Sequence, residues 1–169
     1  MRQQMKFLVL GLFFPVLVSF GAEKPNPEYV RLEMTIDVNV SAKKLWSVAG
    51  GYCDIGRWAN IECEIISGDG GIGTIRVLMG GEITEVMVSK TNSSYGYAQP
   101  PEKGKFYNFY HGFMEARPLT NNSSKLTYTV IYDISELTTK FAKDKDMTTR
   151  RQQFNAALQN IKVIAENEN

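Results

Sequence analysis

The C-terminal segment constrains the fold most, because its apolar residues recur with the period of an α-helix. One face of a helix over residues 147–166 would carry Met147, Phe154, Leu158, Ile161 and Ala165. At ~1.5 Å per residue this helix would be about 30 Å long, enough to cross a β-sheet. It cannot pack on itself, so its apolar face is expected to lie against strands.

The residues before this segment have mostly the pattern of strands. Residues 29–40 alternate between apolar and polar side chains, which predicts a half-buried strand. Residues 42–49 predict a short helix capped by Ser41, and residues 52–58 a second helical turn. Further strands are predicted over residues 61–67, 74–79, 82–90, 95–99, 108–117 and 125–134. This order predicts an α+β fold with an antiparallel sheet and helices on one face.

A glycine-rich loop, ISGDGGIGTIRV at residues 66–77, has glycines 68, 70 and 73 in the spacing G-x-G-x-x-G. In a dinucleotide-binding fold these glycines lead into a helix whose N-terminus meets the phosphates. Here Gly73 leads into strand-like residues. The loop therefore predicts a hairpin turn that uses glycine for positive φ, and not a phosphate site.

The first residues predict a secretory signal peptide. Arg2 and Lys6 precede the apolar run 7–20, and Ser19 and Gly21 are small residues suited to cleavage after Gly21. The run is shorter than the ~20 residues that span a membrane. We expect residues 1–21 to be removed, 22–28 to be a linker and 29–166 to form one domain. The mature protein would be periplasmic or secreted, without a permanent membrane anchor.

The two cysteines, Cys53 and Cys63, have two interpretations: a disulfide in an oxidising compartment, or two buried thiols. The 19 basic and 18 acidic residues nearly balance, which gives no indication of nucleic-acid binding. The single histidine, His111, and two separated cysteines make no ligand cluster. No metal or other cofactor is therefore expected.

Five short motifs occur in order along the domain: VSAKKLW at 40–46, RWANIEC at 57–63, GIGTIR at 71–76, GEITE at 81–85, and Tyr110 eight residues before Pro118. Their order and spacing resemble the START-like, Bet v 1-like (SRPBCC) superfamily, in its bacterial polyketide cyclase/dehydrase-like branch. The resemblance implies a helix-grip fold, in which a curved antiparallel sheet wraps the C-terminal helix and encloses a cavity. It also implies that Gly80 and Gly81, together with the loop 100–105, gate the entrance.

Strand alternation indicates which side chains would face this cavity. The candidate ligand-binding residues are Glu85, Met87, Tyr110, Met114, Tyr128 and Tyr132 from the strands, Phe154, Leu158 and Ile161 from the helix, and Ile61. Ile61 stands where the related plant abscisic acid receptors carry a ligand-pairing lysine. The alternative is that these residues only fill the core, and a register slip of one residue would turn Glu85 outward.

Two functions follow from this set. The first is an exported binding protein for a hydrophobic or amphipathic small molecule, lipid-like or polyaromatic, with Glu85 and Tyr110 orienting a polar end. The second is a polyketide cyclase or dehydratase-like enzyme, with Glu85 as base and a cavity tyrosine as proton donor. One inward carboxylate without an inward histidine provides few groups for catalysis, so the binding function is favoured. No protein partner is indicated.

Overall fold

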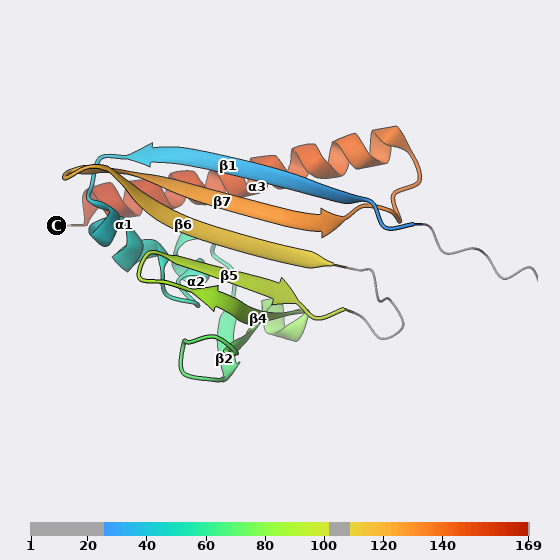
Figure 1. The fold of residues 1–169 in the computed structure, drawn as a ribbon, viewed down its shortest axis with the longest axis horizontal. Coiled ribbons are helices and arrows are strands. Elements are labelled where there is room, and N and C mark those ends of the chain that lie inside the picture. The colour runs from blue at the N-terminus through green and yellow to red at the C-terminus, as the bar shows by residue number, and fades with distance from the viewer. Residues whose placement is uncertain (1–25, 102–108, 169) are drawn as a thin grey trace, which may run out of the picture.

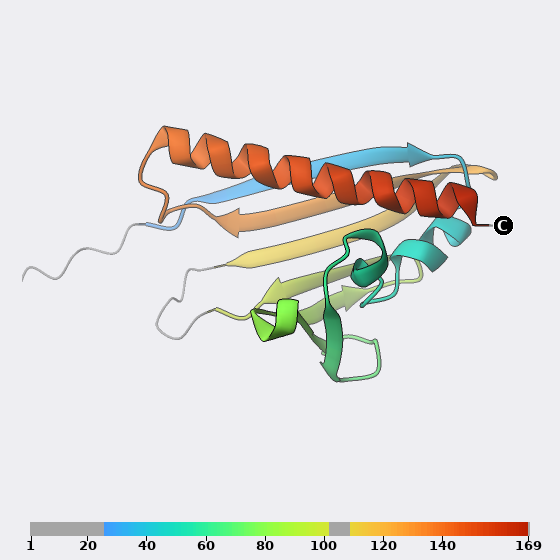
Figure 2. The same cartoon turned by 180° about the vertical axis from the view of Figure 1, so that it is seen from behind.

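The chain forms a curved antiparallel sheet and a long C-terminal helix that lies across one of its faces (Figures 1 and 2). The structure is a computed structural model, and it describes residues 26–101 and 109–168. Its elements are β1 (Tyr29–Val38), α1 (Ala42–Ala49), α2 (Ile55–Trp58), β2 (Cys63–Ser67), β3 (Ile75–Leu78), the 3₁₀ turn η1 (Met79–Gly81), β4 (Ile83–Lys90), β5 (Ser94–Gln99), β6 (Tyr110–Thr120), β7 (Ser123–Asp133) and α3 (Lys140–Asn167).

The sheet has seven strands in the order β1-β7-β6-β5-β4-β3-β2, and each neighbouring pair is antiparallel. Because β1 pairs with β7, the first and last strands of the chain lie side by side, and α3 crosses the sheet over them. The short helices α1 and α2 cover one end of the same face (Figure 2). The predicted α+β helix-grip architecture is confirmed.

The helix α3 is longer than its apolar stripe predicts. It begins at Lys140 rather than near Met147, and the Thr139 hydroxyl caps it by accepting a hydrogen bond from the Ala142 N–H at 3.1 Å. The added turns carry no buried apolar side chain, and Phe141 is 77% exposed. Hydrophobic periodicity could not reveal these turns, because their contacts with the rest of the protein are polar.

The core lies between α3 and the inner face of the sheet. The helix contributes its only buried residues from its second half: Ala157, Leu158, Ile161 and Ala165. The strands contribute large apolar side chains at alternate positions, among them Leu32, Met34, Met114, Leu126 and Val130. This alternation is the one predicted for a sheet with one packed face.

The glycine-rich loop joins β2 to β3 as a hairpin connection, as predicted. Its glycines 68, 70 and 73 have φ of 92°, 89° and 88°. A side chain at position 68 would also overlap Thr74. The turn η1 places Gly80 and Gly81 on the surface, also with positive φ.

Cys53 and Cys63 form a disulfide that links the chain before α2 to the first residue of β2. Of the two interpretations left open by the sequence, the bridge is the one observed. The predicted signal peptide and most of the linker lie outside the described residues, as do positions 102–105 of the predicted second gate loop. Among the described residues, no helix has the length and apolar character needed to cross a membrane.

Candidate functional site

A buried ion pair lies on the inner face of the sheet. Arg76 of β3 and Glu85 of β4 stand directly opposite each other in register. The Arg76 Nε donates to Glu85 Oε2 at 2.8 Å, and Nη2 is 2.6 Å from the same oxygen. The exposed side-chain fractions are 0% and 4%. The other carboxylate oxygen accepts from Gln99 Nε2 at 3.3 Å.

Three tyrosine rings surround the Arg76 guanidinium. Its central carbon is 4.2 Å from the ring centre of Tyr52, 5.1 Å from Tyr97 and 5.9 Å from Tyr95. Nη1 donates to the Tyr52 carbonyl oxygen. Burial alone would lower the pKa of Arg76, but Tyr95 and Glu85 outweigh that effect and raise it. The inner face therefore holds a fixed cation in an aromatic box.

A pair of tyrosine hydroxyls lies next to this box. The hydroxyl oxygens of Tyr97 and Tyr128 are 2.7 Å apart, and the Tyr97 ring lies over Gly112, where any Cβ would overlap it. Burial raises the pKa of both tyrosines well above the usual value. Both phenols are therefore neutral at ordinary pH and act as hydrogen-bonding groups, not as bases.

A second charged cluster joins α3 to the sheet. The Tyr132 hydroxyl donates to Asp146 Oδ2 at 2.7 Å, and Arg150 Nε donates to the same oxygen at 3.0 Å. The Arg150 guanidinium carbon is 4.3 Å from the ring centre of Tyr132 and 5.6 Å from that of Tyr110. Burial raises the pKa of Tyr110 to about 12, although Arg150 opposes this. Arg150 is 33% exposed, so it is the cation here that solvent reaches.

The predicted site residues divide into two groups by burial. Met87, Met114, Tyr128, Leu158 and Ile161 are at most 1% exposed and belong to the core. Glu85 and Tyr132 are each 3% exposed.

The less buried group consists of Tyr110, Phe154 and Ile61, which pack against the core with part of their surface open. The ring of Phe154 lies 4.7 Å from that of Tyr128, and the ring of Tyr110 stacks on Tyr97 at 6.4 Å. These half-buried side chains come from α3, β6 and the segment before β2. They mark the outer part of the space between helix and sheet.

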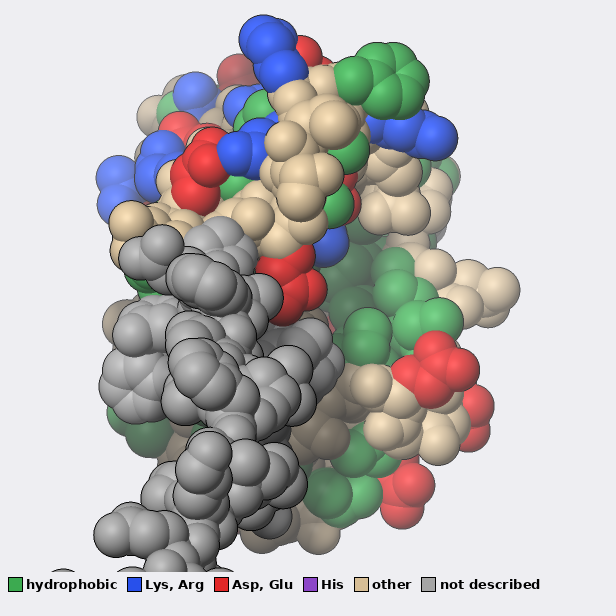
Figure 3. Space-filling model, turned by 90° about the vertical axis from the view of Figure 1, so that its right-hand side faces the viewer, with side chains coloured by type: hydrophobic (Ala, Val, Ile, Leu, Met, Phe, Trp, Pro, Cys, Tyr) green, Lys and Arg blue, Asp and Glu red, His purple; other side chains and the backbone are tan. Residues whose placement is uncertain are grey.

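The molecule has a hollow at the end where α3 begins. Figure 3 shows it from that end, with hydrophobic side chains on its floor. Tyr110 is the first residue of β6 and pairs with Gln99, the last residue of β5, so both lie toward this end (Figure 1).

Sequence reasoning missed two cations and most of the aromatic box. Arg76 was overlooked because its strand, Ile-Arg-Val-Leu, has apolar residues on both faces. One signal was present: positions 76 and 85 are equidistant from Gly80–Gly81, so a turn there puts the two charges opposite each other. No comparable signal pointed to Arg150. Among the described residues, no group of histidine, cysteine or carboxylate side chains is arranged to hold a metal.

No protein-family model and no curated protein sequence matches this chain. Solved structures do match it. The aromatase/cyclase ZhuI from Streptomyces sp. R1128 superposes with a TM-score of 0.63 at 16% identity, over 82% of this chain and 94% of that one. A truncated norcoclaurine synthase from Thalictrum flavum gives 0.63 and 16%, over 87% and 99%. The protein Ara h 8.0201 gives 0.60 and 15%, over 83% and 100%.

The fold is Bet v 1-like. At these identities the likeness establishes the fold, and it confirms at that level the resemblance carried by the sequence motifs.

Proposed function

We propose that this protein binds a hydrophobic or amphipathic small molecule in the outer part of the space between α3 and the sheet. The observation that carries the proposal is the pair of half-buried rings, Tyr110 and Phe154, each packed on a fully buried tyrosine. Such rings offer a rigid apolar surface to a ligand at little cost in side-chain entropy.

Polar groups near these rings favour a ligand with oxygen acceptors at one end. Arg150 lies beside Tyr110 and is partly exposed. Its guanidinium complements carbonyl, carboxylate or phenol oxygens.

Catalysis by Glu85 is the less favoured function, although two of the structural neighbours are named as enzymes. A general base needs a free oxygen within reach of the proton it removes. Glu85 is 3% exposed, and its two oxygens are engaged by Arg76 and Gln99. We therefore assign this carboxylate to holding Arg76 in place.

The proposed site of action is outside the cytoplasm. The Cys53–Cys63 disulfide supports this assignment, because such bridges persist in oxidising compartments. The basic and apolar N-terminal segment supports it independently.

The test has two steps. Native mass spectrometry of the protein purified from its own compartment is expected to show a retained small molecule. Binding of the fluorescent probe 1-anilinonaphthalene-8-sulfonate is then measured in the wild type and in variants of the site. Phe154→Ala is expected to weaken probe binding about tenfold, since it removes an aromatic contact and its apolar area.

His111→Ala is the matched control for Tyr110→Ala, because the two residues are adjacent on β6 but lie on opposite faces of the sheet. Tyr110→Ala is expected to weaken probe binding and His111→Ala to leave it unchanged. The proposal fails if the protein retains no small molecule and does not bind the probe. It also fails if Phe154→Ala and Tyr110→Ala both bind the probe as the wild type does.

A further inference from the structure

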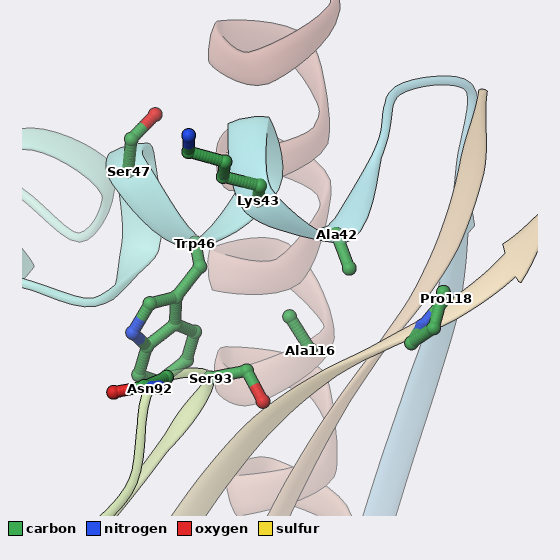
Figure 4. Close-up of a pocket in the computed structure, with 8 residues that line it drawn as sticks. All are labelled: Ala42, Lys43, Trp46, Ser47, Asn92, Ser93, Ala116 and Pro118. Carbon is green, nitrogen blue, oxygen red and sulfur yellow. The ribbon is translucent and has the colours of Figure 1, made fainter. Parts of the chain in front are cut away.

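A separate groove lies at the opposite end of the molecule from the hollow. It has a volume of about 460 Å³ and runs between α1, the β4–β5 turn and the end of β6. Figure 4 shows the Trp46 side chain extending from α1 toward the turn at Asn92 and Ser93, with Ala116 and Pro118 of β6 across from it. None of these residues belongs to the proposed ligand site.

The floor of the groove is apolar and held in place. Trp46 is half-buried, and its ring centre is 5.8 Å from that of Tyr95 in the core. Gly50 allows the indole to lie against the backbone, since a Cβ there would overlap it. Ala116 is 1% exposed and closes the bottom. The floor is therefore a preformed surface that takes an apolar ring without rearranging.

The rim supplies one uncompensated charge. Lys43 lines the groove, and within the described part of the chain its ammonium makes no ion pair and no hydrogen bond. The Ser47 hydroxyl is already committed to the Lys44 carbonyl oxygen at 2.7 Å, whereas the Asn92 side chain has no hydrogen-bond partner among the described residues. No carboxylate lines the groove. The rim thus complements an anion, with an amide beside it.

We propose that this groove is a second binding site, for a small molecule that combines an apolar ring with one acidic group. The ring lies between Trp46, Ala116 and Pro118, and the acid pairs with Lys43. This site is independent of the ligand space under α3, so either site can be occupied without the other.

The test uses 3-phenylpropionate as probe and 3-phenylpropionamide as its neutral counterpart. The chain has two tryptophans, and Trp58 is buried in α2, so ¹H–¹⁵N spectra carry two indole signals. Trp58→Phe assigns them. Titration with 3-phenylpropionate is expected to shift the Trp46 indole signal and leave that of Trp58 in place.

Two substitutions separate the charge from the shape. Lys43→Gln, at an exposed position, is expected to weaken the binding of 3-phenylpropionate about fivefold, which is the effect of losing a partly solvated ion pair. The affinity for the amide is expected to stay unchanged. Ala116→Leu is expected to fill the groove and abolish binding of both. Phe154→Ala, in the other site, is expected to change neither.

Three results would overturn the proposal. The first is a Trp46 signal that does not move at millimolar probe. The second is a Lys43→Gln variant that binds 3-phenylpropionate and the amide with the same affinities as the wild type. The third is a Phe154→Ala variant in which the Trp46 signal no longer responds, which would assign the probe to the space under α3. Because Lys43 is on the surface, a loss of folding in Ala116→Leu does not affect the first two readouts.

Discussion

The Arg76–Glu85 pair allows a prediction whose size follows from its burial. Glu85→Gln keeps the shape of the side chain but leaves the Arg76 charge buried with no anion. Arginine cannot lose its proton at ordinary pH. Removing one partner of a buried ion pair costs about 3–5 kcal/mol, against a total stability of ~5–15 kcal/mol for a typical domain. We expect Glu85→Gln to lower the free energy of unfolding by about 3–5 kcal/mol.

The reverse substitution, Arg76→Met, leaves the Glu85 carboxylate buried without its cation. It is expected to lower the free energy of unfolding by a similar amount, because it too removes one partner of a buried ion pair. The double variant Arg76→Met/Glu85→Leu, with no buried charge, is expected to fall within about 2 kcal/mol of wild type.

Urea unfolding followed by tryptophan fluorescence measures all three variants. Glu115→Gln is the matched control, since Glu115 pairs with an exposed Arg117 on the outer face and such pairs contribute at most about 1 kcal/mol. The reasoning is refuted if Glu85→Gln costs no more than this control, or if the double variant loses as much as the two single variants combined.

Three further predictions concern other features. Gly112→Ala is expected to cost about 1–3 kcal/mol, because the new methyl group overlaps the Tyr97 ring. Replacing Cys53 and Cys63 by serine is expected to cost about 2.7 kcal/mol in urea unfolding, from the loop entropy of a ten-residue separation. Partial burial alone would raise the pKa of Asp133, but N–H donors lower it, so its stabilising effect is present above pH ~4 and is lost as pH falls through the lowered value. The stability gap between wild type and Asp133→Asn is therefore expected to close below that pH in acid titration.

Each of these predictions has its own check. Gly56→Ala, where a Cβ meets only an ordinary contact at 3.4 Å, is expected to be nearly neutral, and an equal loss at 56 and 112 would contradict the overlap argument. The double serine variant and wild type are expected to converge under reductant; a gap that persists would mean the serines act otherwise than through the bridge. If the difference in stability between wild type and Asp133→Asn widened in acid, the predicted direction of the pH dependence would be wrong.

The sequence predicted which side chains point inward where the two faces of an element differ in polarity, but not where both faces are apolar. In β1 the alternation of apolar and polar residues matches the observed burial closely. In β3 the half-buried Ile75 and Val77 flank the fully buried Arg76, so composition alone gives no inward direction. The first two turns of α3 were missed for a related reason, since they contact too little of the core to need an apolar stripe.

The groove beside Trp46 was beyond sequence reasoning altogether. Its walls come from α1, the β4–β5 turn and β6, and only the fold brings these segments together. For the candidate site under α3, the periodicity of β6 and of the C-terminal helix indicated that Tyr110 and Phe154 face the space between helix and sheet, and both rings pack against the core there. The sequence left open whether Cys53 and Cys63 form a disulfide or remain free thiols, and only their proximity in the structure decides between the two.

The helix α3 is anchored unevenly along its length. Its buried side chains all lie from Ala157 onward, and that half is also tied by Asn160 to the Trp58 carbonyl at 2.9 Å and by Lys162 to the Asp37 carbonyl at 2.8 Å. The leading half has no buried residue and contacts the sheet mainly through polar groups, the Tyr132–Asp146–Arg150 cluster among them. Amide protons in the leading half are therefore expected to exchange with deuterium sooner than those near Ile161, so local opening of α3 would start at its N-terminal end.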